Sequence, residues 1–378
     1  MRARLFRNFD ELPPSYLRLF DEVGRSNFYL SLPWFRNLTA TVRDPGDTLR
    51  IYGVDDGDGI DDAKAVLVMR GRNEIGGRKG LRTLAGYANF YSMIFAPVMR
   101  AGEPRAAAIL RTWTKAVAAE RPAWDAVHFL ALDRDAPSHD QLVGALRAAG
   151  FLVGGQPDFG NWYLPVAGMT FDDYVGTLSG SMRGTVRSRG RRLAREHAVR
   201  FEFCRDTSGL ETTIAAYQHV YDRSWKQPEP YPDFIPGLIR AAAEAGALRM
   251  SVLYVDETPA AAQFWIVCAG KATIYKLAHD EAFKNLSVGT VLTARIMQEV
   301  LAQDSPTEVD YGHGDDPYKK DWLSLRRERR AIEAYNMHTA NGLFYGLFLI
   351  GGRAIKSWIE RISKRSSPKP ADGQGANS

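Results

Sequence analysis

Apolar residues along the first half of the chain recur with the periods of strands and of helices in turn. Short apolar runs predict buried strands, whereas apolar positions spaced three and four residues apart predict helices. The predicted strands span 49–54, 65–69 and 127–132, and the predicted helices span 105–120 and 141–149. This alternation indicates an αβ unit that occupies residues 1–165.

The second half of the chain repeats the pattern with longer elements. Its predicted helices span 183–196, 210–224, 237–245 and 289–303, and its predicted strands span 199–204, 248–255, 260–268, 271–279 and 307–311. Prolines between 228 and 236 break the chain before the third of these helices. Two αβ halves of similar size indicate a duplicated domain, with the second half at residues 166–340.

Residues 341–378 differ in character from both halves. Glycines interrupt the apolar residues of 343–350, and apolar residues from Ile355 to Ile362 then recur at helical spacing among arginines and lysines. Such a basic amphipathic helix is typical of a segment that lies on an anionic membrane surface, although it could also dock on the protein's own core. We predict a membrane contact through residues 343–365, followed by a tail with the composition of a disordered segment.

Composition limits the class of protein without identifying it. The 378 residues are 45% hydrophobic and 25% charged, which is ordinary for a globular protein with a sizeable core. The net charge of +5 suits an anionic partner, such as a phosphate-bearing cofactor, an acidic membrane surface or a nucleic acid. Because we find neither a secretory signal nor an apolar membrane span, we expect a cytoplasmic protein, peripheral at the inner membrane if its C-terminal helix binds lipid.

Cysteine and acidic residues give no metal signature. Cys204 and Cys268 are too far apart for a disulfide framework or a four-ligand zinc site, which favours a reducing compartment. The acidic turn at 55–62 begins like a calcium loop, but its twelfth position is Leu67 or Met69 where such a loop needs Glu. We therefore predict no metal ion.

Two stretches of the second half carry candidate chemistry. Residues 284–290 (KNLSVGT) join a strand to a helix, with Ser287 as a good N-cap and Gly289 allowing a ligand to approach the backbone. Since a helix N-terminus attracts anions, this loop is either a pyrophosphate site helped by Lys284 or an ordinary capped helix start. Residues 311–322 (YGHGDDPYKKDW) crowd titratable groups directly after a predicted strand.

A basic stripe precedes these stretches. Arginines at 183, 187, 191 and 195 recur every four residues and so share one face of a helix. The stripe is either a solvated face paired with carboxylates or a contact for the phosphates of a cofactor, a phosphorylated acceptor or lipid headgroups. We do not expect nucleic-acid binding, because this stretch has no interleaved aromatic residues for stacking on bases.

Four motifs together resemble the GNAT acyltransferase core, and more specifically its BioF2-like (CelD-like) branch, which is similar in architecture to Fem-type aminoacyl transferases. The motifs are the basic stretch from Ser179 to Arg192, PAAAQFWIV at 259–267, IYKLAHDEAFKNLSVGT at 274–290 and EVDYGHGDDPYKKDW at 308–322. The resemblance covers residues 179–336, and the first half matches only as a degenerate partner half. It implies an α/β (α+β) fold of tandem GNAT-like halves, each with a mixed, mostly antiparallel sheet flanked by helices.

The resemblance also implies site residues and a co-substrate. Acyl-CoA would bind along a strand end and the pyrophosphate loop, at Leu277, Ala278, Lys284, Ser287, Val288, Gly289 and Thr290. Amine acylation needs a base for the incoming ammonium, hydrogen-bond donors for the oxyanion and an acid for the leaving thiolate. Tyr318 is the predicted acid, and Lys319 would offset developing charge.

The base stays open among three residues. Asp315 or Asp316 could position or deprotonate the amine, although Asp316 could instead be the N-cap of a helix that starts near Pro317. His279 is a further candidate, with an ordinary pKa of about 6.5, unless it is a structural residue at a strand end. No Cys or Ser has the context of a nucleophile, which favours direct transfer.

The acceptor is the least constrained part of this prediction. Candidate acceptor residues are Trp225, Lys226, Tyr231, Arg183 and Arg187, although Trp225 and Tyr231 could simply be core residues. The segments SWKQPEP, IYKLAHDE and GDDPYKKDW resemble those of bacterial ceramide-synthase relatives. This resemblance implies fatty acyl transfer to the amine of a sphingoid base. The CelD-like branch instead implies acetyl transfer to an amino sugar in exopolysaccharide or cellulose assembly. Two further alternatives are a membrane-associated regulator and an enzyme that uses aminoacyl-tRNA.

Overall fold

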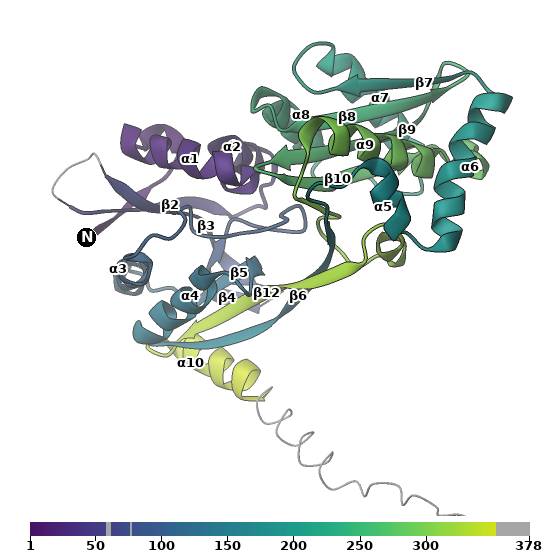
Figure 1. Ribbon diagram of the computed structural model, residues 1–378. Helices are drawn as coiled ribbons and strands as arrows, with labels where there is room; N and C mark the ends of the chain where they lie inside the picture. The colour runs from purple at the N-terminus through teal and green to yellow at the C-terminus, as the bar shows by residue number, and fades with distance from the viewer. Residues whose placement is uncertain (58–61, 76–77, 353–378) are drawn as a thin grey trace, which may run out of the picture.

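The computed structural model describes residues 1–57, 62–75 and 78–352 (Figure 1). Its strands form one mixed sheet in the order β1-β2-β3-β4-β5-β12-β6-β11-β10-β9-β8-β7. The strands are β1 Arg2–Phe6, β2 Thr48–Asp55, β3 Ala63–Ile75, β4 Arg78–Gly86, β5 Ala126–Asp133, β6 Phe151–Pro165, β7 Val199–Cys204, β8 Leu248–Val255, β9 Thr258–Cys268, β10 Lys271–His279, β11 Glu308–Asp310 and β12 Leu325–Asn336. The predicted amphipathic helix beyond residue 352 and the predicted tail lie outside the described residues.

The pairing of strands repeats in the two halves of the sheet. β1 to β4 pair antiparallel, and β4 then pairs parallel with β5. In the same way β7 to β10 pair antiparallel, and β10 then pairs parallel with β11. A helix crosses over between the two parallel strands each time, α3 (Ala106–Ala119) in the first half and α9 (Val288–Asp304) in the second. The predicted class, a tandem fold with a mixed and mostly antiparallel sheet, is confirmed.

The two halves share their last strands. β6 pairs with β11 of the second half, and β12 pairs with β5 of the first half and with β6. Figure 1 shows β6 and β12 running side by side between the first half and the second. The boundary near residue 165 remains a prediction, since each of these strands contributes to both parts of the sheet.

Helices cover the sheet and complete two apolar cores. The remaining helices are α1 Pro14–Ser26, α2 Leu32–Thr41, α4 Pro137–Ala148, α5 Phe171–Thr177, α6 Gly180–Glu196, α7 Leu210–Asp222, α8 Phe234–Glu244 and α10 Ala340–Gly346. Helix α8 begins three residues before the predicted start, because Pro236 is tolerated in the first turn of a helix. Trp34 on α2 packs against Phe234 on α8 and Tyr275 on β10, so one core joins the two halves.

No helix of the described chain is long and apolar enough to span a membrane. The last described turns are α10 and a π-helical turn at Leu347–Gly351. Tyr345, Leu349 and Ile350 pack against the sheet, whereas Phe344, Leu347 and Phe348 are exposed. Residues 340–351 therefore dock one face on the protein's own core and leave an apolar face uncovered, whereas the two alternatives predicted for the helix from Ile355 to Ile362 concern residues outside the described ranges.

Candidate functional site

The divergence of two parallel strands opens the candidate site. β10 and β11 pair only from Lys271 to Thr273, after which β11 ends at Asp310 while β10 continues to His279. The N-terminus of α9 and the chain that follows β11 enter the space beyond the last pair. The predicted anion loop and the predicted cluster at 311–322 are thereby brought to one place.

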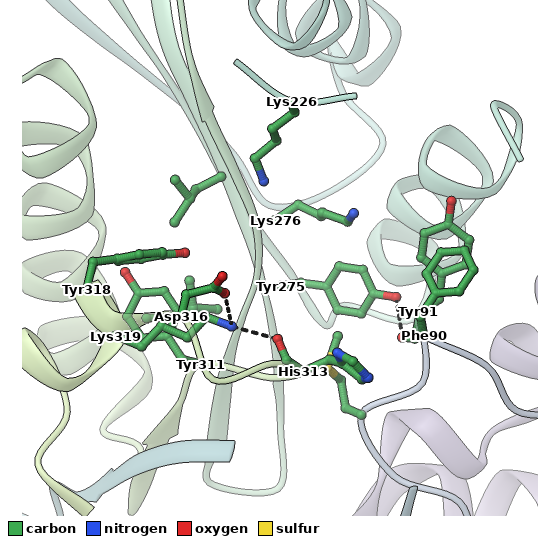
Figure 2. Close-up of a pocket in the computed structure, with 13 residues that line it drawn as sticks. Phe90, Tyr91, Lys226, Tyr275, Lys276, Tyr311, His313, Asp316, Tyr318 and Lys319 are labelled. Atoms are coloured by element: carbon green, nitrogen blue, oxygen red, sulfur yellow. Dashed lines mark hydrogen bonds and ion pairs between the residues drawn. The ribbon is translucent and has the colours of Figure 1, made fainter. Parts of the chain in front are cut away.

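Two adjoining cavities occupy this space. The first, here the loop cavity, has a volume of about 410 Å³ and is lined by Met182, Trp225, Leu277, His279, Lys284, Ser287, Val288, Gly289, Thr290, Thr293, Tyr311, Tyr318, Asp321 and Trp322. The second, here the lysine cavity, measures about 220 Å³ and is lined by Phe90, Tyr91, Met93, Lys226, Ile274, Tyr275, Lys276, Leu277, Tyr311, His313, Asp316, Tyr318 and Lys319 (Figure 2). Leu277, Tyr311 and Tyr318 line both cavities and form the wall between them.

The loop cavity contains most of the predicted pyrophosphate loop. Ser287 occupies the predicted N-cap position of α9 in the left-handed conformation (φ 57°), but its side chain makes no capping hydrogen bond to the helix. A Cβ at Gly289 would lie 3.4 Å from Nδ1 of His279, so the glycine leaves the entrance of α9 open. Ala278 is buried and lines neither cavity. The first backbone N–H groups of α9 face a cavity beside Lys284, an arrangement that suits phosphate oxygens.

Two tyrosines form the wall between the cavities. The rings of Tyr311 and Tyr318 meet edge to face, with centroids 5.6 Å apart. Partial burial, together with the charge of Asp316, raises the pKa of Tyr318, so its phenol stays protonated at neutral pH. Tyr311 is 3% exposed, and its hydroxyl lies near the side chain of Thr293 without forming a well-aligned hydrogen bond in the described structure. A buried hydroxyl without a strong partner is free to donate a hydrogen bond to a ligand atom that enters either cavity.

The two predicted aspartates differ in their surroundings. Asp315 lies outside both cavities, where it accepts hydrogen bonds from Arg326 at 2.7 Å and from Nε1 of Trp162 at 2.7 Å. These partners lower its pKa, and its position outside both cavities leaves the catalytic role of Asp315 a prediction that the contacts do not favour. Asp316 lines the lysine cavity, where it pairs with Nζ of Lys319 at 3.1 Å. Its side chain makes no capping hydrogen bond to the 3-10 helix that follows.

Lys319 and His279 are also committed to neighbours. The side chain of Lys319 is buried and donates to the carbonyl oxygens of His313 and Gly314, which fixes the turn after β11. His279 faces the loop cavity with its ring against Trp225, at a centroid distance of 4.4 Å. Burial lowers the pKa of His279, so the imidazole is neutral at pH 7. His279 therefore lies on the side of the anion loop.

The lysine cavity is bordered by an ion pair that the sequence did not single out, in which Lys276 lines the cavity and Glu229 lies behind it. Glu229 accepts hydrogen bonds from Nζ of Lys276 at 2.6 Å and from the hydroxyls of Tyr91 at 2.6 Å and Tyr221 at 2.7 Å. Phe90, Tyr91 and Met93 come from the first half of the chain. Lys276 belongs to the quoted motif IYKLAHDE, but no sequence signal connects the first-half aromatic residues with this site.

The remaining predicted acceptor residues divide between the site and other surfaces. Trp225 lines the loop cavity, and Lys226 lines the lysine cavity. Tyr231 lines neither, because its hydroxyl bonds to Asp44 in the first half. Arg183 and Arg187 also lie outside both cavities. Arg183 donates to the carbonyl of Leu178, and Arg187 borders a separate groove between α6 and α9.

Comparisons with known proteins agree with this geometry. Residues 180–320 match the family model described as an acetyltransferase (GNAT) domain. The fold is similar to the crystal structure of FemX, with a TM-score of 0.57 and 11% identity over 91% of this chain and 99% of that chain. No curated protein matches the sequence.

Two further solved structures share the fold. L-PGS from Bacillus licheniformis has a TM-score of 0.52 and 14% identity, over 89% of this chain and 96% of that chain. The C-terminal domain of a putative lysylphosphatidylglycerol synthetase from Agrobacterium fabrum has a TM-score of 0.51 and 14% identity, over 89% of this chain and 97% of that chain. The chain carries a GNAT domain and is an acyltransferase of that type. GNAT folds generally use acyl-CoA, and no group of three or more metal-ligating side chains is found within the described ranges.

Proposed function

We propose that this GNAT-type acyltransferase binds acyl-CoA in the loop cavity and an amine in the lysine cavity, and that the acyl group passes directly between them. The observation that carries the proposal is the shared wall of Leu277, Tyr311 and Tyr318. A thioester in the first cavity and an amine in the second would meet at that wall. Neither cysteine of the chain lines either cavity, which favours direct transfer over an acyl-enzyme.

The loop cavity fits the donor in charge and in shape. The N-terminus of α9 and Lys284 supply positive charge for the pyrophosphate. Gly289 keeps side-chain atoms away from the first turn, and Leu277 at the splayed end of β10 offers an apolar contact for the pantetheine arm. The predicted donor residues are therefore retained in this proposal, except the buried Ala278.

The two tyrosines supply the polar groups that acyl transfer needs. The thiolate of CoA is a good leaving group with a pKa of about 8.5, so a neutral phenol such as that of Tyr318 suffices to protonate it. The hydroxyl of Tyr311, which has no well-aligned partner, would donate a hydrogen bond to the oxyanion that develops on the thioester carbonyl. Asp316 and Lys319 would hold the turn that positions Tyr318.

For the acceptor we propose the amine of a sphingoid base, with a fatty acyl donor. The mouths of the two cavities have an aromatic rim, because Phe90, Trp225 and Tyr318 are 48%, 49% and 41% exposed. An aromatic rim above a polar cavity suits a molecule with a polar amine head and an apolar tail. An amino sugar remains the alternative, favoured by the polar side chains that line the lysine cavity.

A lipid acceptor would be delivered most directly at a membrane surface. The exposed apolar residues Phe344, Leu347 and Phe348 precede a sequence rich in arginine and lysine, so the C-terminal segment is proposed to contact anionic lipid. Vesicles that contain phosphatidylglycerol should then retain the full-length protein in sedimentation. Replacement of Phe344 and Phe348 by Ser should release it, whereas equal retention of both forms would contradict the contact.

Thiol release by the purified protein tests the proposed function. Acetyl-CoA and palmitoyl-CoA would each be paired with a sphingoid base and with glucosamine, and the products identified by mass. We expect turnover with palmitoyl-CoA and the sphingoid base, and a loss of at least 10-fold in Tyr318→Phe. Tyr254→Phe on the remote strand β8 is the matched control. Turnover only with acetyl-CoA and glucosamine would establish the alternative, and no turnover with any pair would contradict both acceptors.

A further inference from the structure

The proposed function leaves the base for the incoming ammonium unassigned, and the contacts of the lysine cavity exclude most candidates. Asp316 pairs with Lys319, and Asp315 lies outside the cavity. Both carboxylate oxygens of Glu229 accept hydrogen bonds, from Lys276 and two tyrosines. A carboxylate held in this way by cationic or phenolic donors is a poor proton acceptor.

The two histidines near the site are also poorly placed. His279 faces the loop cavity, on the side of the pyrophosphate loop. His313 lines the lysine cavity with its ring against Phe159 at a centroid distance of 3.9 Å, and the charges that act on it are Asp158, Lys319, Asp316 and Lys276. In Figure 2 its ring lies well away from Tyr318.

Lys226 occupies the position that a base needs. It follows α7 and extends into the lysine cavity, and Figure 2 shows its ammonium nitrogen directed into that space. Within the described ranges no carboxylate lies at ion-pair distance from this nitrogen, which stands 5.6 Å from the ring centre of Trp225. The charge of Lys226 affects the pKa of His279 in the loop cavity, and the charges of Lys319 and Asp316 in the lysine cavity affect the pKa of Lys226. Lys226 therefore stands near the junction of the two cavities.

The surroundings of Lys226 also favour its neutral form. Burial and the charges of Lys276 and Lys319 lower its pKa to about 8, against the opposing charges of Glu229 and Asp316. At pH 8 about half of the Lys226 side chains would be neutral, compared with roughly one in 300 for a lysine of ordinary pKa. Lysines lowered to this range serve as general bases in other enzymes.

We propose that Lys226 accepts the proton of the acceptor ammonium, and this inference rests on the proposed amine acylation. The ammonium loses two protons on becoming an amide. One passes to neutral Lys226 and from there to water. The nitrogen forms the new C–N bond as the C–S bond breaks, and the second proton ends on the sulfur of CoA by way of Tyr318. The net products are amide, free CoA and one proton.

Replacement of Lys226 by Met and by Arg separates this role from mere charge. Lys226→Met should lower kcat/KM by about 10²- to 10⁴-fold with unchanged binding of CoA. It should also move the rising limb of the pH profile from about 8 to the pKa of the free acceptor amine. Lys226→Arg should lose as much, since guanidinium keeps the charge but cannot accept a proton at these pH values. If the wild-type protein transfers acyl groups and Lys226→Arg is equally active, the role of Lys226 as base is overturned while the proposed function stands.

A second measurement needs no substrate and no variant. Competitive labelling of the intact protein with trace acetic anhydride, read by peptide mass across pH 6 to 11, reports the ionisation of each lysine. Lys226 should reach half of its maximal labelling near pH 8, and exposed Lys115 on α3 serves as the comparison lysine in the same digest. Coincident curves for Lys226 and Lys115 would overturn the inference even if no acceptor had been found.

Discussion

Glu229 links the two halves of the chain beside the lysine cavity, and its replacement by Gln should destabilise the protein measurably. The carboxylate holds Lys276, Tyr91 of the first half and Tyr221 of α7 through three hydrogen bonds of 2.6 to 2.7 Å. A hydrogen bond to a charged group contributes about 1 kcal/mol more than a neutral one, so the two that an amide oxygen could keep lose about 2 kcal/mol together. The third donor would face the amide NH₂ and lose its acceptor.

We therefore expect a destabilisation of about 3 kcal/mol, discounted because Lys276 can turn to water. With an unfolding entropy of about 2.1 cal/mol/K per residue, this corresponds to a fall in Tm of about 4 °C. The matched control is Glu211→Gln, which breaks a bidentate pair with Arg240 of similar length on the surface. Exposed pairs contribute about 0–1 kcal/mol, so the control should shift Tm by about 1 °C or less.

The stability that Glu229 contributes should depend on pH in a definite direction. The donors around Glu229 lower its pKa in the folded protein, against the opposing effect of burial. Its stabilisation is therefore present above the pKa of the unfolded state and is lost as pH falls through the folded value. The difference between wild type and Glu229→Gln, measured by differential scanning fluorimetry, should shrink between pH 7 and pH 3. A Tm within 1 °C of the Glu211→Gln control at pH 7 would refute this account of the site.

Three further substitutions test individual side chains. Tyr311→Phe should leave Tm unchanged or raised, because its hydroxyl has no well-aligned partner to lose, yet should lower kcat by about 10- to 100-fold. Equal kcat for both forms would remove Tyr311 from the oxyanion site. Asp315→Asn should keep kcat within about 3-fold while lowering Tm by about 1 °C, since Asp315 bonds only to Arg326 and Trp162 outside the cavities. A loss of kcat as large as that of Tyr318→Phe would restore Asp315 as a candidate base. Gly289→Ala should weaken CoA binding by about 10-fold in calorimetry. Its Tm should change little, because the new Cβ would lie no closer than 3.4 Å to His279. Unchanged affinity for CoA would contradict the placement of the pyrophosphate.

The sequence predicted most elements of the second half, but it missed several elements of the first half and the last strand of the sheet. Strands 248–255 and 271–279 have the bounds that their apolar runs indicated. β12 was missed because its sequence, LRRERRAIEAYN, begins with five consecutive charged residues, some of which pair across the sheet, where an apolar run would have indicated a strand. Helices α1 and α2 were also missed, although their apolar faces bury Phe20, Trp34 and other residues of the core.

The candidate site was predictable where one stretch of chain carries it. Residues 284–290 and Tyr318 are local features, and the loop cavity brings them together. The contribution of Phe90 and Tyr91 depends on how the two halves pack, and local patterns carry no information about that packing. Asp315 and Asp316 are adjacent in sequence, but the turn at Gly314 (φ 102°) sends one toward Arg326 and the other into the cavity.

The central claim is that donor and acceptor occupy adjoining cavities at the same time. Initial velocities, measured while acyl-CoA and the amine identified by thiol release are both varied, test it most directly. Direct transfer predicts intersecting double-reciprocal lines, and no acyl group on the protein by intact mass after incubation with acyl-CoA alone. Parallel lines, together with a protein that gains the mass of one acyl group, would contradict the claim.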